Sequence, residues 1–157
     1  MRKHVRTFAL TAALAMAAAL GTAVPAEAAS PLQLRRIQYD SPGTDTRSNT
    51  SLNKEYVTVK NISKSTVNLK NHVLHDRASS KGKKWTYAYT FGSISLKAGA
   101  SVKVRTGKGR NTSATRYWQR GSYVWNNTGD TATLRNSRGT KLDSCTWKKK
   151  SPGYVNC

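Results

Sequence analysis

The chain has 157 residues, enough for a leader segment and one domain. Its 27 lysine and arginine residues against seven aspartate and glutamate residues give a net charge of +20, which predicts attraction to polyanions but does not identify a fold. Three histidines and a few scattered carboxylates offer little material for a catalytic centre, so we expect no enzymatic activity and no cofactor.

Residues 1–28 have the pattern of a signal peptide. A basic start precedes an apolar, alanine-rich run over 7–24, and small residues at 26 and 28 predict cleavage before Ala29. An uncleaved anchor is the alternative, because the run is near the lower limit of roughly 17–25 residues for a membrane span. We expect a secreted, extracellular monomer without transmembrane insertion, and attachment to the cell wall is left open. Removing 28 residues, with three of the 27 basic and one of the seven acidic, leaves 129 residues of net charge +18.

Alternating apolar residues run through most of the mature chain, and Gly, Pro and Asn turns separate the segments. Short strands at such spacing predict an all-β fold, a sandwich or barrel of about seven to nine strands with almost no helix. The expected strands are 34–39, 55–60, 66–74, 85–91, 101–105, 131–135 and 141–147. In the fourth of these, Trp85, Tyr87, Tyr89 and Phe91 share one face. Two longer segments, 40–53 and 106–125, are irregular, and loops of this length often carry function.

Four segments in order resemble the lamin tail domain family. They are Leu52–Asn61 (LNKEYVTVKN), Lys97–Val102 (KAGASV), Thr106–Gly109 (TGKG) and Trp125–Leu134 (WNNTGDTATL). The resemblance covers about residues 33–147, and His72 departs from it where members commonly have a large residue. It implies that residues 29–157 form an immunoglobulin-like β-sandwich with a basic C-terminal tail. It also implies a binding or targeting module rather than a catalyst, as in similar exported bacterial members.

Cys145 and Cys157 are the only cysteines. In an oxidising compartment such a pair predicts a disulfide, which would hold the tail 147–156 onto the last strand. Two free thiols or an intermolecular bridge are the alternatives.

The segment 116–130 (RYWQRGSYVWNNTGD) supports two interpretations. Its aromatic and basic residues could form a platform for single-stranded nucleic acid, in which bases stack on rings and arginines follow the backbone. They could instead close the open end of the sandwich, and this interpretation places Trp125 in the core and leaves Arg116 and Arg120 exposed. The candidate polyanion-binding residues are Arg105, Lys108, Arg110, Arg116, Trp118 and Arg120. The TGKG segment lacks the spacing of a phosphate-binding P-loop, and we expect it to be a flexible basic loop with exposed backbone N–H groups.

We expect no metal site. His72 and His75 diverge if they lie three apart on a strand, so the sequence favours surface histidines over a site shared with Asp76. Calcium at Asp40, Asp45, Asn53 and Glu55 is a weaker alternative to a Glu55 ion pair with a nearby lysine or arginine.

The favoured function is an exported, non-catalytic module that attaches to polyanions, either wall teichoic acid or extracellular DNA or RNA, through a basic surface. The alternative is a structural or protein-interaction module that binds a cell-surface protein and uses its charge for solubility. A secreted inhibitor or toxin-like factor is a third, less supported interpretation.

Overall fold

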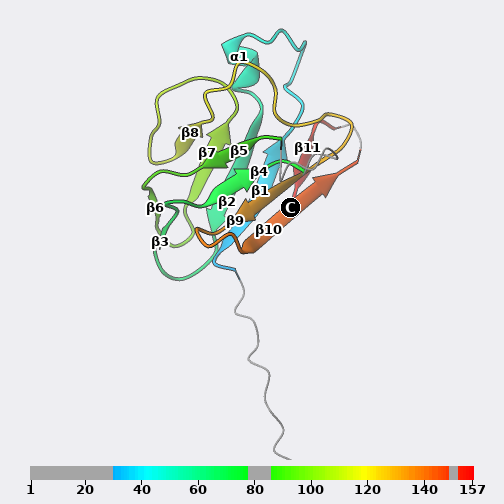
Figure 1. The fold of residues 1–157 in the computed structure, drawn as a ribbon. Helices are drawn as coiled ribbons and strands as arrows, with labels where there is room; N and C mark the ends of the chain where they lie inside the picture. The colour runs from blue at the N-terminus through cyan, green and yellow to red at the C-terminus, as the bar shows by residue number, and fades with distance from the viewer. Residues whose placement is uncertain (1–29, 78–85, 149–151) are drawn as a thin grey trace, which may run out of the picture.

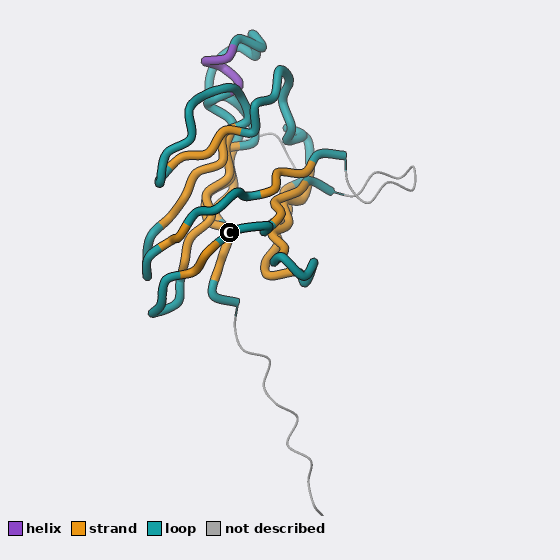
Figure 2. The backbone as a smooth tube through the Cα atoms, turned by 60° about the vertical axis from the view of Figure 1, so that its left-hand side comes forward, coloured by secondary structure: helices purple, strands orange, loops and turns teal. Residues whose placement is uncertain are grey.

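The computed structural model describes residues 30–77, 86–148 and 152–157, which form a β-sandwich of two main layers (Figures 1 and 2). The all-β prediction is confirmed. The predicted signal peptide and Trp85 lie outside the described residues. None of the described helices is long and apolar enough to cross a membrane.

The larger layer has five strands, in the order β11 (Tyr154–Asn156), β1 (Leu32–Gln38), β2 (Tyr56–Asn61), β7 (Ser101–Arg105) and β8 (Thr115–Tyr117). The smaller layer has four, β10 (Lys141–Trp147), β9 (Asp130–Arg135), β4 (Val73–His75) and β5 (Ala88–Thr90). A separate pair consists of β3 (Val67–Asn68) and β6 (Ser95–Leu96). Neighbouring strands are antiparallel, except that β8 runs parallel to β7. The one helix in the described ranges, α1 (Asn49–Leu52), lies at one end of the sandwich (Figure 1).

The centre of the five-stranded layer follows directly from the sequence pattern. Val57 and Val59 of β2 pair with Val104 and Val102 of β7, and all four side chains are buried against the other layer. Each buried valine contributes about 1.5–3 kcal/mol relative to an exposed one. The residues between them alternate outward, and they carry the charges described below.

Strand β1 contains a bulge that explains its irregular pattern. Leu34 pairs with Val59 and Ile37 with Val57, so β1 has one residue more than β2 over this interval. The extra residue moves the apolar positions from even to odd numbers, and Leu32, Leu34, Ile37 and Tyr39 are therefore all buried.

The strand predicted over 66–74 is in fact two short strands. β3 and β4 are separated by a turn at Asn71, whose φ of 62° is in the left-handed region that asparagine tolerates better than most residues. Leu69 stays in the core and Asn71 turns out to solvent, so the apparent alternation through this segment came from two elements.

The disulfide between Cys145 and Cys157 is confirmed, with a Cα–Cα distance of 5.8 Å. The predicted position of the tail is wrong, because β11 pairs with the first strand, β1, and not with the last strand. Since Cys145 belongs to β10 in the other layer, the disulfide links the two layers.

Between the layers, six aromatic rings are in contact one after another. Ring centroids are separated by 4.8 to 5.9 Å along the series Tyr39, Trp147, Trp125, Trp118, Tyr89 and Phe91. Trp125 is buried, as the interpretation of 116–130 as a core-closing segment predicts. Trp118 packs partly buried against the core, so neither ring is a free stacking platform.

Candidate polyanion-binding surface

Glu55, which precedes β2, holds the irregular segment 106–125 in place from inside the domain. Its carboxylate is fully buried and accepts hydrogen bonds from the Thr106 hydroxyl at 2.5 Å and the backbone N–H groups of Val124 at 3.1 Å and Trp125 at 2.9 Å. Both ends of the segment are therefore bound to one side chain. This contact joins three of the four sequence motifs, LNKEYVTVKN, TGKG and WNNTGDTATL.

The expected Glu55 ion pair with a lysine or arginine is wrong, because its partners are a hydroxyl and backbone amides. Burial raises the pKa of Glu55 to about 8, and the three hydrogen bonds only partly oppose this effect. The calcium candidates do not converge either. Asp40 accepts a hydrogen bond from the Asn127 amide at 2.8 Å, and Asn53 donates to the Lys108 carbonyl at 2.9 Å.

The TGKG segment is pinned to α1, contrary to the expected flexible loop. The Asn49 side chain accepts from the Lys108 N–H at 2.7 Å and donates to its carbonyl oxygen at 3.0 Å. A Cβ at Gly107 would lie 2.6 Å from the Asn53 Oδ1 atom, and a Cβ at Gly109 would lie 2.4 Å from the Tyr117 ring. Both glycines are needed for close packing, so the backbone of the segment, from which the basic side chains extend, is held at a defined place.

The structure divides the six candidate residues into two groups. Arg105 is on β7 and faces the outside of the five-stranded layer, and Lys108 and Arg110 follow it on the exposed loop. Arg116, Trp118 and Arg120 lie instead along the side where β8 approaches β5.

The second group is largely structural. Arg116 is the register partner of the buried Val104, and its charge lies close enough to Tyr89 to oppose the rise in the pKa of that phenol caused by burial. The Arg120 guanidinium lies 4.5 Å from the centroid of the Tyr87 ring. Both arginines are half-buried, and the prediction that they are exposed is wrong.

Arg105 belongs to a larger basic face, here called the outer face, which consists of the outward residues of the five-stranded layer, and Lys108 and Arg110 follow it on the adjoining loop. One register row across the layer contains Tyr154, Gln38, Tyr56, Arg105 and Tyr117, since directly paired residues share a face.

The aromatic ring at the middle of this row holds two cations beside each other. The Lys103 Nζ atom lies 4.6 Å and the Arg105 guanidinium carbon 5.7 Å from the Tyr56 ring centroid. Such cation–π contacts stabilise the pair by about 0.5–1 kcal/mol each at exposed sites. Lys60 lies on the same face, two residues from the Lys103 register position. Sequence reasoning missed Lys103 and Tyr56, although their alternation with the buried valines was visible.

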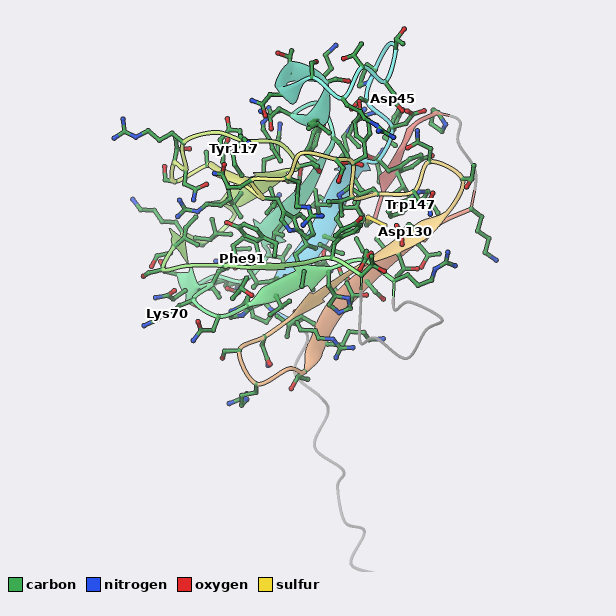
Figure 3. All side chains as sticks on the ribbon, turned by 45° about the horizontal axis from the view of Figure 1, so that its top comes forward. Asp45, Lys70, Phe91, Tyr117, Asp130 and Trp147 are labelled. Carbon is green, nitrogen blue, oxygen red and sulfur yellow. A yellow bond between two sulfur atoms is a disulfide. The ribbon has the colours of Figure 1, made fainter. Side chains whose placement is uncertain are left out.

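A depression at the end of the outer face nearest α1 has a volume of about 460 Å³. Its lining is Thr50, Asn53, Lys54, Arg105, Thr115 and Tyr117. Arg105 donates a hydrogen bond from its guanidinium to the Asn53 carbonyl oxygen, which fixes the charged group at this position. Figure 3 shows Tyr117 and Trp147 at well-separated places, so the depression is distinct from the aromatic series at its Trp147 end.

The acidic residues are used elsewhere. Five of the six carboxylates in the described ranges accept hydrogen bonds from hydroxyl, side-chain amide or backbone N–H groups, and Asp45 is exposed. The five are Asp40, Glu55, Asp76, Asp130 and Asp143. Burial also raises the pKa of Asp76, which accepts from the Thr86 and Tyr87 amides. The lining of the depression contains no carboxylate.

The expectation that His75 is a surface residue is wrong, because its side chain is buried on β4. Its Nε2 atom lies 3.0 Å from the Arg135 Nε atom, and its Nδ1 atom lies 2.7 Å from the Asp76 carbonyl oxygen, so both ring nitrogens have hydrogen-bond partners inside the domain. His72 lies partly exposed outside the strand. The described part of the chain has no group of three potential metal ligands close together.

The model of the Lamin Tail Domain family matches residues 25–149, a span that includes all four motifs. No curated protein matches the chain.

Proposed function

Because the chain belongs to the lamin tail domain family of non-catalytic, immunoglobulin-like domains, we propose that it acts by binding, and that its ligand is a polyanion held on the outer face. We also propose that residues 1–28 direct its export, so that the ligand is extracellular DNA or RNA or wall teichoic acid.

The observation that carries this proposal is the placement of positive and negative charge. Lys60, Lys103 and Arg105 lie together on the outer face, and Lys108 continues from it on a loop held by hydrogen bonds. Five of the six carboxylates in the described ranges accept hydrogen bonds from N–H or O–H groups within the fold. A cationic surface of this kind attracts a polyanion from a distance and binds it by releasing counterions.

The opposite layer supports the assignment by contrast. Its outward residues near the centre carry hydroxyl groups, and the Oγ1 atoms of Thr131 and Thr146 lie 2.9 Å apart across β9 and β10. Ser144 and Thr133 form the next pair of the same two strands. These two pairs carry no charge, and the cations Arg135 and Lys141 are paired at the end of the same two strands. On the outer face the cations lie instead across the middle of the sheet, on β2 and β7, where a ligand can contact both strands together.

The test compares two triple variants of the mature chain, each lowering the net charge by three units. In the first, Lys60, Lys103 and Lys108 are changed to Gln, and in the control Lys70, Arg138 and Lys141 are changed to Gln. Dissociation constants for DNA are measured between about 50 and 200 mM salt. Each phosphate contact contributes about 0.9 to the slope of log K against log salt for duplex DNA, so we expect the first variant to lower the slope by about 2–3 and the control by less than 1.

Equal effects of the two triple variants would contradict a defined surface and would leave attraction by net charge alone. Binding that is independent of salt in the unmodified domain would contradict the polyanion itself, and would favour the alternative of a protein-interaction module. Export is tested separately by the N-terminal sequence of the protein in the culture medium, which we expect to begin at Ala29.

A further inference from the structure

We propose that the depression beside α1 is a subsite for the phosphodiester group of a polymer. This inference rests on the proposed function and deepens it, because it assigns a chemical class and a position to the ligand. The lining residues are those given above for the depression.

The lining is rich in hydrogen-bond donors. Arg105 contributes a guanidinium with five N–H groups, and Lys54 contributes an ammonium with three. Three further groups, the hydroxyls of Thr50, Thr115 and Tyr117, can donate or accept. Charged donors with adjustable hydroxyls and no carboxylate match the several acceptor oxygens of a phosphate ester.

The donors are held in place before a ligand arrives. The Asn53 carbonyl accepts from Arg105, and the Pro42 carbonyl accepts from the Lys54 Nζ atom at 3.2 Å. The Tyr117 ring packs directly on the backbone of Gly109, where a Cβ would be 2.4 Å from the ring. Prior ordering lowers the entropy that binding would otherwise cost.

The depression has room for more than a single phosphate ion. A volume of about 460 Å³ is larger than one phosphate group needs, so the sugar or glycerol attached to it would also fit, beside the Tyr117 ring. From Arg105 the outer face continues along β7 to Lys103, at a spacing of about 6.6 Å for residues two apart on a strand. Lys60 of β2 follows on the same face. A chain with one negative charge in each repeat can therefore leave the depression and meet further cations.

The first experiment maps the contact by nuclear magnetic resonance. Backbone amide shifts of the mature chain are followed during titration with a thymidine tetranucleotide, a glycerol phosphate trimer and a heparin tetrasaccharide. We expect one or both phosphodiester probes to shift the amides of Thr50, Lys54, Thr115 and Tyr117. A response to the tetranucleotide alone identifies nucleic acid as the source, a response to the trimer alone identifies teichoic acid, and responses to both identify the shared ester. Equal shifts of the same amides by heparin would overturn the assignment to phosphodiester.

The second experiment uses matched variants with the phosphodiester probe that binds more tightly. Thr115→Val removes a hydroxyl from the depression, and Thr58→Val removes one elsewhere on the outer face, beside Lys103. We expect about a three- to tenfold loss of affinity for the first and less than twofold for the second. Lys54→Gln should weaken binding about tenfold, and Lys70→Gln, with the same net charge, less than twofold. Equal losses within each pair would overturn the subsite.

The two proposals can fail separately. If long DNA binds with a steep salt dependence but neither short probe shifts the amides of the depression, the subsite is wrong and the proposed function stands. If neither long DNA nor a short probe binds, both are wrong. The amide spectrum of each variant is recorded first, and only variants that keep the dispersed spectrum of the unmodified domain are compared, so that unfolding is not counted as a loss of affinity.

Discussion

The stability of the domain should depend on pH through Glu55. Its pKa is raised from 4.5 to about 8 by burial. Between these values the folded carboxyl keeps a proton that the unfolded chain has released, so the free energy of unfolding falls as the pH rises. The contribution of Glu55 is fully present below about pH 4.5 and is lost progressively up to about pH 8. A shift of about 3.5 units corresponds to about 5 kcal/mol, or about 1.4 kcal/mol for each pH unit.

The assay is urea unfolding followed by tryptophan fluorescence at pH 5, 6, 7 and 8, at constant ionic strength. Glu55→Gln should lower the free energy of unfolding at pH 5 by about 1–3 kcal/mol. The carboxyl group accepts hydrogen bonds from three donors, and the amide NH₂ group of glutamine would face one of these donors without accepting from it. It should also lose the Glu55 part of the pH slope. Asp76 has a raised pKa in both proteins, so the difference between the two slopes isolates Glu55.

The control is Asp45→Asn, which removes an exposed carboxylate. The charge of Asp45 has the smallest effect among the causes that shift the Glu55 pKa. This variant should therefore keep nearly the whole dependence of the unfolding free energy on pH. Identical slopes in the unmodified domain and Glu55→Gln, or a difference of the opposite sign, would refute the assignment of a raised pKa to this buried carboxyl.

Three further changes test other parts of the structure by the same urea assay. Cys157→Ser opens the link from Cys145 over a separation of 12 residues and should lower the free energy of unfolding by about 3 kcal/mol; an unchanged value would show that the layers do not need the link. Trp118→Ala removes the ring between Tyr89 and Trp125 and should cost about 2–4 kcal/mol, while the salt dependence of DNA binding stays the same; a changed salt slope would return Trp118 to the binding surface. Gly107→Ala places a methyl group against α1 and should cost about 1–3 kcal/mol, and no cost would mean that the loop is not packed there.

The fold was predictable wherever one strand buries alternate residues. The segments 101–105 and 141–147 are observed as β7 and β10 with the predicted bounds, because alternation and flanking turns agree there. The prediction failed where alternation did not reflect one strand, as at Asn71, where a left-handed residue separates β3 from β4. It also missed β8 and β11, whose three residues each are too few to show a period and which depend on neighbouring strands.

The candidate site was predictable only in part, for a related reason. Arg105, Lys108 and Arg110 could be selected from charge, and the structure keeps them near one face. Arg116 and Arg120 have the same charge and similar neighbours in sequence. The pairing of Arg116 with Val104 and the contact of Arg120 with the Tyr87 ring nevertheless place them along the side of the sandwich. Composition cannot distinguish the two groups, since the distinction depends on which strand pairs with which.

Strand register also explains why the outer face has its particular residues. The alternation that buries Val57 and Val59 forces Tyr56, Thr58 and Lys60 outward, and the same applies to β7, where Lys103 and Arg105 point away from the core. Antiparallel pairing then brings Lys103 and Arg105 to the Tyr56 ring, although about 50 residues of chain separate them from it. The burial of the valines and the arrangement of the cations thus both follow from one register. A shift of the register by one residue would expose the valines and bury the charges. A surface built in this way is as well defined as the core beneath it.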